Sequence, residues 1–270
     1  MGKKTLIVGT LVLSAASFIT RVLGFIFRIY MSNLMGAEGM GLYQLIFPIY
    51  MLIWSATSAG IALSVSKMVA EFTSKKQHAN AIRTLRVSLL ISISLSIVIG
   101  LFIYFFAPYI AIYFIHAPQT TLSLKILATC APFMAAACCI RGYFQGRQEM
   151  VVPAIAQIGE QVMRMLAIYL FAGFFVNKGV SYACALGVVG MCFGEAFSFV
   201  FSYISYKLKK SSLKMSKASI SYLKLFTSLF SLAIPITANR FLTSTLQSIE
   251  NILIPIQLQK YGLSEMDAIS

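Results

Sequence analysis

The chain has 270 residues, of which 59% are hydrophobic and only 11% are charged, and its formal net charge is +14. Soluble domains usually contain about 25% charged residues, so this composition excludes an ordinary soluble domain. The net charge alone would suit a nucleic-acid partner, but the basic residues lie between apolar runs, and we therefore predict no nucleic-acid binding.

Seven long apolar runs predict an all-α, polytopic membrane helix bundle. About 20 helical residues cross the ~30 Å hydrocarbon core. Lipid offers no hydrogen bonds to the backbone, so a span must be a helix or part of a closed barrel. The runs are too long and too continuously apolar for barrel strands. The predicted spans are 6–33, 41–66, 87–107, 123–141, 150–173, 183–206 and 224–258.

The connections on the N-terminal side of this bundle carry most of the basic residues. Positive residues collect on the cytoplasmic side of a membrane. The sequence therefore predicts a multi-pass protein of the cytoplasmic membrane, with its N-terminus inside and Ser270 outside. The basic residues assigned to the inside connections are Lys3, Lys4, Lys67, Lys75, Lys76, Arg83, Arg86, Arg141, Arg147, Lys207, Lys209, Lys210, Lys214, Lys217 and Lys224.

The first span carries a polar stripe. Its beginning resembles a signal peptide, but the apolar run continues to Met31, which favours an uncleaved helix. Charged residues inside a membrane usually face a cavity or one another. Alternatively, Arg28 reaches the outer interface and Arg21 caps a neighbouring helix. The stripe residues, at spacings of three and four, are Thr10, Ser14, Ser17, Arg21, Gly24 and Arg28.

The connection between the second and third spans, Lys67–Arg86, has apolar residues between its charges. This pattern predicts an amphipathic helix at the membrane interface.

The fifth span places Gln157, Glu160, Gln161 and Arg164 on one helical face. Glu160 and Arg164 are four residues apart and can form an ion pair within the helix. Such a pair has either a structural role, because it lowers the cost of burial, or a role at a substrate site.

The sixth span predicts a helix-packing seam of small residues, with Glu195 beside it. The five cysteines lie in apolar spans without a CxxC spacing, and the two histidines lie in loops on opposite sides. We therefore predict no metal site, disulfide or cofactor. The seam residues are Gly187, Gly190, Gly194, Ser198, Ser202 and Ser205.

The stretch from Lys207 to Lys224 is polar and is predicted to be a linker. It separates a six-helix unit, 1–222, from a seventh helix in 223–270, which we expect to begin a further part of a longer transporter. That helix has its own polar stripe, which predicts contact with a cavity or with further helices of a longer transporter. The stripe residues are Arg240, Thr243, Ser244, Gln247, Glu250 and Asn251.

No phosphate loop, HExxH motif or Ser-His-Asp candidate occurs in the sequence, so we do not expect an enzyme. Arginines within spans favour an anionic substrate group, above all a phosphate or diphosphate, which the guanidinium fork binds. The expected partners are an anionic, lipid-attached molecule, membrane lipids and partner helices; a coupling ion is an open candidate. The candidate substrate-binding residues are Arg21, Arg28, Arg164, Arg240, Glu160, Gln157, Gln247 and Glu250.

Several motifs together resemble the flippases of the multidrug/oligosaccharidyl-lipid/polysaccharide exporter superfamily, in particular the stage V sporulation protein B branch. The resemblance covers nearly the whole chain. The motifs are Thr20-Arg21-Val22-Leu23-Gly24-Phe25 with Arg28, Gly39-Met40-Gly41-Leu42-Tyr43, Ser66-Lys67-Met68-Val69-Ala70-Glu71, Arg141-Gly142-Tyr143-Phe144-Gln145-Gly146-Arg147-Gln148 and Glu160-Gln161-Val162-Met163-Arg164.

The resemblance implies two six-helix lobes that face each other across a central cavity, with residues 1–222 as the first lobe. It also implies that the partners are a lipid-linked saccharide and a second lobe. Arg21 would hold the diphosphate of this substrate, a cell-wall or spore-cortex precursor. Arg28 matches less closely, because the second arginine lies one residue later here. Arg240 has no motif match.

Two other functions stay open at this stage. A multidrug/cation antiporter of the same superfamily would use Glu160, Glu195 or Glu250 as its cation site. A non-transporting membrane scaffold in spore envelope assembly would need no polar cavity, so charge changes in the stripes would be silent.

Overall fold

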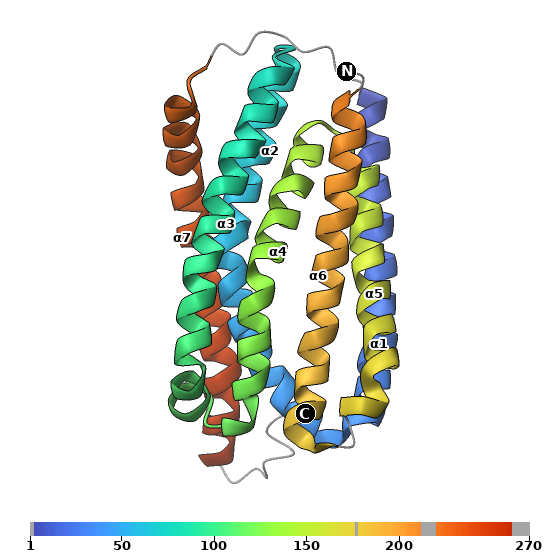
Figure 1. Ribbon diagram of the computed structural model, residues 1–270, viewed down its shortest axis with the longest axis vertical. Helices are drawn as coiled ribbons and strands as arrows, with labels where there is room; N and C mark the ends of the chain where they lie inside the picture. Colours follow the sequence, from blue (N-terminus) through green and yellow to red (C-terminus); the bar gives the residue numbers. More distant parts are fainter. Residues whose placement is uncertain (1–2, 176–177, 212–219, 261–270) are drawn as a thin grey trace.

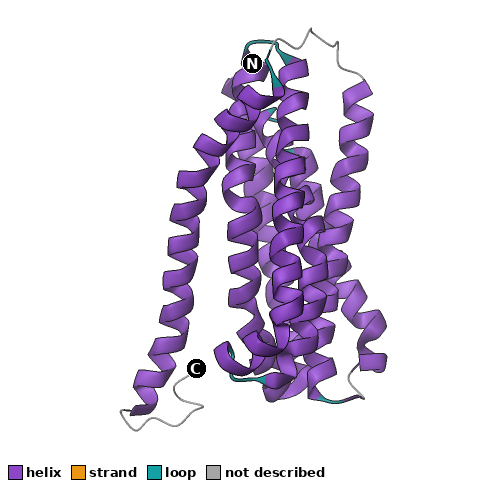
Figure 2. Cartoon of the chain, turned by 60° about the vertical axis from the view of Figure 1, so that its left-hand side comes forward, coloured by secondary structure: helices purple, strands orange, loops and turns teal. Residues whose placement is uncertain are grey.

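The chain forms a bundle of long helices in the computed structural model, which describes residues 3–175, 178–211 and 220–260 (Figure 1). These described residues contain no β-strand (Figure 2). The predicted all-α bundle is therefore confirmed. The α-helices are α1 (Lys3–Trp54), α2 (Gly60–Ser74), α3 (His78–Tyr109), α4 (Thr121–Gly146), α5 (Val151–Phe175), α6 (Val180–Ser211) and α7 (Tyr222–Lys260). Short π and 3-10 turns cover Ser55–Ala59, Ile110–Phe114 and Pro118–Thr120.

Helix α1 consists of two arms that meet at Gly36. This glycine has φ 69° and ψ 180°, a backbone conformation outside the helical region that residues with a side chain rarely adopt. The first arm descends from the N-terminus, and the chain then turns back at the far end of the bundle (Figure 1). The break falls in the predicted connection between spans 6–33 and 41–66, so those two spans form separate arms.

Five segments of the described residues are long and apolar enough to cross a bilayer: Ile7–Ser74, His78–Phe114, Pro118–Gly146, Val151–Phe175 and Val180–Lys210. The first has 68 residues and includes both arms of α1, so it is too long for one crossing. Helix α7 is not among these segments. The polytopic bundle is thus supported, and the count of seven crossings stays a prediction.

The turns of the bundle lie at two opposite ends. The α4–α5 turn adjoins the end of α6, where Lys209 is 2.6 Å from Glu149. Residues Val8, Gly9 and Val12 of α1 line the same hollow as Glu149 and Lys209. The start of α1 and the basic ends of these helices therefore share one end of the molecule, as the distribution of basic residues predicts.

The interfacial helix predicted for Lys67–Arg86 is wrong. Helix α2 continues to Ser74, and α3 begins at His78 after a tight turn in which Lys76 has φ 58°. The amphipathic pattern arises because these residues form the ends of two spanning helices, each with one face on the bundle.

Labelling of single cysteines is expected to place Lys76 and Arg147 on the cytoplasmic side and Lys178 on the outside. The same orientation predicts Lys214 inside and Ser270 outside, although both lie outside the described residues. An impermeant maleimide applied to intact cells and to inverted vesicles measures this. Labelling of positions 76 and 178 from the same side would contradict the orientation.

Helix α4 lies at the centre of the bundle, in contact with α2, α3 and α6. Glycines permit its close approach to α2. A Cβ added to Gly142 would lie 2.6 Å from the carbonyl oxygen of Ala62. Because backbone atoms cannot move aside as a side-chain end can, residue 142 has to be glycine for this packing.

Substitution of Gly142 by leucine is expected to separate α2 from α4 and to lower the thermal stability of the detergent-solubilised protein. Overpacking costs about 1–3 kcal/mol and more where backbone is displaced. Gly41→Leu is the matched control, because nothing lies within 4 Å of a Cβ at Gly41. Equal melting temperatures for the two variants would contradict the close packing.

Helix α7 packs against α2 and α3. It begins at Tyr222, next to the predicted boundary between 1–222 and 223–270, and residues 212–219 of the predicted linker lie outside the described residues. The assignment of these segments to two lobes stays a prediction.

Candidate functional site

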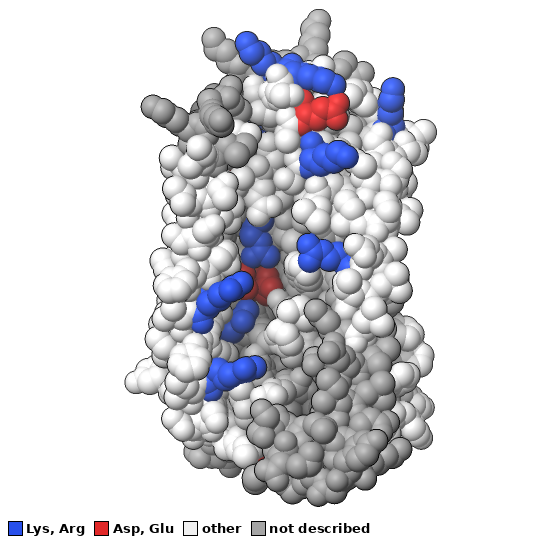
Figure 3. Space-filling view, turned by 180° about the vertical axis from the view of Figure 1, so that it is seen from behind, with Lys and Arg blue, Asp and Glu red and all other residues white. Residues whose placement is uncertain are grey.

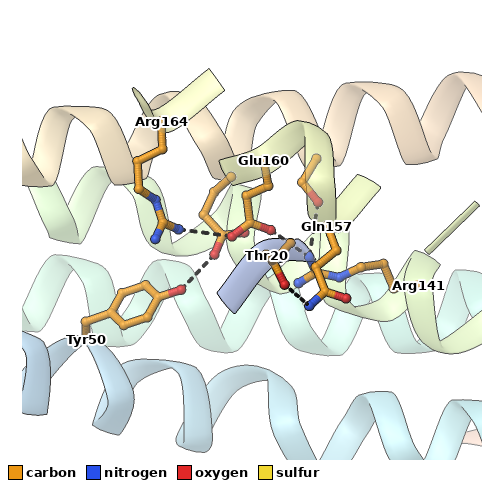
Figure 4. A network of polar contacts seen from close by, with 8 residues as sticks. Thr20, Tyr50, Arg141, Gln157, Glu160 and Arg164 are labelled. Carbon is orange, nitrogen blue, oxygen red and sulfur yellow. Dashed lines mark hydrogen bonds and ion pairs between the residues drawn. The ribbon is translucent and has the colours of Figure 1, made fainter. Parts of the chain in front are cut away.

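A group of charged side chains lies inside the bundle around Glu160 of α5 (Figure 4). Arg164 Nη2 is 3.0 Å from Glu160 Oε1, which confirms the predicted pair within the helix. Arg141 Nη1 is 2.9 Å from the second carboxylate oxygen, Oε2, and also donates to Ser198 Oγ at 3.1 Å. One carboxylate therefore binds two guanidinium groups from two helices.

The assignment of Arg141 to a cytoplasmic connection is wrong. Helix α4 continues to Gly146, so Arg141 lies within the helix, more than a turn before its end. Its guanidinium points to α5 and α6, and only 19% of the side chain is exposed. Arg141 is the main charged residue of this group that the sequence analysis missed.

The seam of small residues on α6 brings this helix close to α5 at the charged positions. A Cβ added to Gly194 would lie 2.8 Å from the carbonyl oxygen of Glu160, and one at Gly190 would lie 3.1 Å from that of Arg164. Ser198 continues the seam and is fully buried. The predicted packing face is confirmed, and it fixes the height of Glu160 and Arg164 against α6.

The three charged side chains are mostly buried but keep some contact with solvent. Glu160 and Arg164 are each 15% exposed. Arg164 Nε has no hydrogen-bond partner among the described residues. Seen from behind, basic side chains gather around an acidic patch in a hollow at mid-height of the molecule (Figure 3). Arg141, Glu160 and Arg164 thus contribute two positive charges and one negative charge, and all three side chains are partly accessible.

A second carboxyl group, Glu195 of α6, lies close to this group. Its Oε1 accepts a hydrogen bond from the Tyr50 hydroxyl at 2.8 Å (Figure 4). Glu195 is only 1% exposed, and it interacts electrostatically with Arg141, Glu160 and Arg164. Sequence reasoning placed Glu195 beside the seam but could not find Tyr50, which is 145 positions away in the chain.

The first arm of α1 packs against α5 at the polar stripe. Gln157 Nε2 donates to Thr20 Oγ1 at 3.2 Å, and a Cβ on Gly24 would lie 3.7 Å from Gln161 Nε2. Arg21 and Arg28 are exposed and make no ion pair or hydrogen bond with another described residue. Their guanidinium groups are thus available to a ligand or to headgroups, and their role as substrate ligands stays a prediction.

The described side chains of α7 make no ion pair or hydrogen bond with this group. Arg240 is exposed, and within the described part of the chain no ion pair or hydrogen bond connects it to Glu160. Gln247 and Glu250 lie in a part of α7 whose side chains are outside the described residues. These three candidate residues therefore stay predictions from the polar stripe alone.

Comparison with known proteins gives two kinds of similarity. A family model described as "Polysaccharide biosynthesis protein" matches residues 6–260. The chain is 32% identical to stage V sporulation protein B of Bacillus subtilis (strain 168), over 99% of this chain and 52% of that protein. It is 27% identical to the lipid II flippase MurJ of the same organism, over 84% of this chain and 45% of that protein. The chain thus spans about half the length of these curated relatives.

Solved structures of other proteins have the same arrangement of helices as this chain. An outward-facing multidrug resistance transporter of the MATE family, in the MOP superfamily, superposes with a TM-score of 0.69 over 94% of this chain and 56% of that one. The sequence identity in this superposition is 17%, so the likeness concerns the arrangement of helices and not the chemistry of the site.

Proposed function

Since the chain belongs to the polysaccharide biosynthesis protein family, we propose that it forms the first lobe, 1–222, and the opening helix of the second lobe of a flippase. The flippase moves a lipid-linked oligosaccharide or a cell-wall or spore-cortex peptidoglycan precursor across the cytoplasmic membrane. The main observation behind this proposal is that the single carboxylate of Glu160 pairs with both Arg141 and Arg164. Two guanidinium groups at one carboxylate within the membrane favour binding of an anionic substrate group.

The chemistry of the site fits a diphosphate better than a neutral or cationic group. Each guanidinium presents a fork of donors that matches two phosphate oxygens. Glu160 holds Arg141 and Arg164 in place while the site is empty of substrate. A diphosphate carries more charge and more acceptor oxygens than one carboxylate, so it can add to both arginines without displacing them. Arg21 and Arg28 on α1 are exposed and add two further guanidinium groups on a helix that packs against α5.

A cation antiporter is the main rival function. Glu160 and Glu195 would be its cation ligands, but Glu160 is already occupied by two arginines. A cationic drug at Glu160 would meet Arg141 and Arg164, whose positive charges repel it. A membrane scaffold is the second rival, and nothing in a scaffold requires an arginine pair that is partly exposed inside the bundle.

The experiment uses the complete gene product in proteoliposomes that contain a fluorescent prenyl-diphosphate saccharide in both leaflets. Chemical quenching of the outer leaflet then measures how fast the inner pool becomes accessible. We expect rapid exchange of this lipid and slow exchange of a fluorescent phosphatidylcholine in the same vesicles. Exchange of neither lipid, together with proton- or sodium-driven efflux of a cationic dye, would favour the antiporter. Absence of both activities, with silent charge variants, would favour the scaffold.

A further inference from the structure

Glu195 is a buried carboxyl group with one oxygen unused. Its Oε1 accepts the hydrogen bond from Tyr50, but Oε2 has no hydrogen-bond partner among the described residues. An ionised carboxylate in this position would bury a negative charge with incomplete hydrogen bonding, which costs free energy. A proton on Oε2 removes the buried negative charge, so Glu195 can exist in two protonation states at this position.

The groups that face Glu195 come from all the helices packed around it. From α4 come Arg141 and Cys138, from α5 come Glu160 and Arg164, and from the second arm of α1 comes Tyr50. Cys130 of α4 and Cys192 of α6 complete the titratable surroundings. Thiols and phenols are ordinarily neutral near pH 7. The charge of the site is therefore decided by two arginines and two carboxyl groups.

The protonation state of Glu195 changes the net charge of this site. With Glu195 ionised, two carboxylates balance the two arginines, and the site is neutral. With Glu195 protonated, only Glu160 remains negative, and the site has a net charge of one positive unit. An anion is bound more tightly in the second state, because opposite charges attract strongly where water is largely excluded.

We propose that Glu195 is a proton-binding site linked to anion binding at Arg141 and Arg164, so that a proton and the substrate diphosphate enter the site together. This proposal rests on the proposed function and adds its coupling ion. A proton is the ion that fits. A metal cation such as calcium needs several oxygen ligands. Oε2 has no hydrogen-bond partner among the described residues, and the positive charges of Arg141 and Arg164 oppose a metal cation there. Linkage then makes substrate binding weaken as the pH rises.

The test measures binding of geranyl diphosphate to the complete gene product in lipid nanodiscs across about pH 5.5 to 8, with geraniol as the reference compound. For the wild type we expect the Kd to rise with pH, by up to about tenfold per unit for one linked proton. Glu195→Gln mimics the protonated form, so we expect tight binding with a clearly smaller slope. Glu38→Gln is the matched control, since Glu38 is exposed near the break in α1, and it should keep the wild-type slope.

Protonation of the diphosphate itself is common to all variants, so the difference between the slopes isolates Glu195. Tyr50→Phe is a second test of the proton site, for the case in which the Glu195→Gln variant does not accumulate in the membrane. It removes the hydrogen bond to Oε1 and thereby destabilises the ionised form, so the binding profile should move to higher pH. A Glu195→Gln slope equal to that of the wild type, or an unmoved Tyr50→Phe profile, would overturn the proton site. Equal binding of geraniol and geranyl diphosphate by the wild type would instead contradict the proposed function.

Discussion

Replacement of Glu160 by glutamine is expected to reduce strongly the amount of folded protein in the membrane. The change removes the shared counter-charge of Arg141 and Arg164, which are only 19% and 15% exposed. Leaving a buried charge unpaired typically costs about 3–5 kcal/mol, comparable to a large part of the stability of a folded domain. Size-exclusion chromatography of a fluorescent fusion, before and after heating, measures this loss.

The matched control is Glu71→Gln. Glu71 forms an ion pair with Lys75 at the end of α2, and both side chains are 57% exposed. Exposed ion pairs contribute about 0–1 kcal/mol, so this variant should accumulate nearly normally. Equal losses for Glu71→Gln and Glu160→Gln would contradict a special role of the buried ion pairs around Glu160.

Rescue of Glu160→Gln requires changes at both arginines. The pattern in α5 alone suggests that adding Arg164→Met would suffice. Because Arg141 binds the same carboxylate, this double variant still contains one unpaired guanidinium and should recover only part of the loss. A triple variant that also has Arg141→Met should recover more. If the triple variant folds well yet does not transport, the cluster serves function rather than stability.

Replacement of Arg21 by alanine is expected to abolish transport while membrane levels stay near normal. Arg21 is exposed and makes no ion pair or hydrogen bond with another described residue, so its removal leaves no buried group unpaired. A charge-assisted hydrogen bond contributes about 1.5–3 kcal/mol, which corresponds to about a 10- to 100-fold loss of diphosphate affinity. Transport in the proteoliposome assay and binding of geranyl diphosphate measure the effect.

Substitutions near Arg21 refine this result. Lysine keeps the charge but lacks the guanidinium fork, so Arg21→Lys should be partly active at best. Arg28→Ala should be milder, because its position departs from the flippase pattern and its side chain can reach the outer interface. The control is Arg86→Ala. Arg86 is an exposed residue in the first part of α3, and this variant should be fully active. A fully active Arg21→Ala protein would show that Arg21 does not bind the diphosphate.

The sequence by itself determined the helical class, the presence of several long apolar helices and the gathering of basic residues at one end of the bundle. It also determined the Glu160–Arg164 pair and the small-residue seam of α6. These features depend on apolar length, composition and contacts within one helix. A spacing of four residues brings two side chains together wherever a helix forms, so local pattern is sufficient.

Only the tertiary structure decided which helices contribute to the charged site. Arg141 at the edge of a predicted span could equally face the cytoplasm, and it meets Glu160 and Ser198 because α4, α5 and α6 pack at one particular rotation and height. Tyr50 meets Glu195 for the same reason. Contacts between helices depend on register and rotation, which arise from the packing of all side chains together and leave no local signal in the sequence.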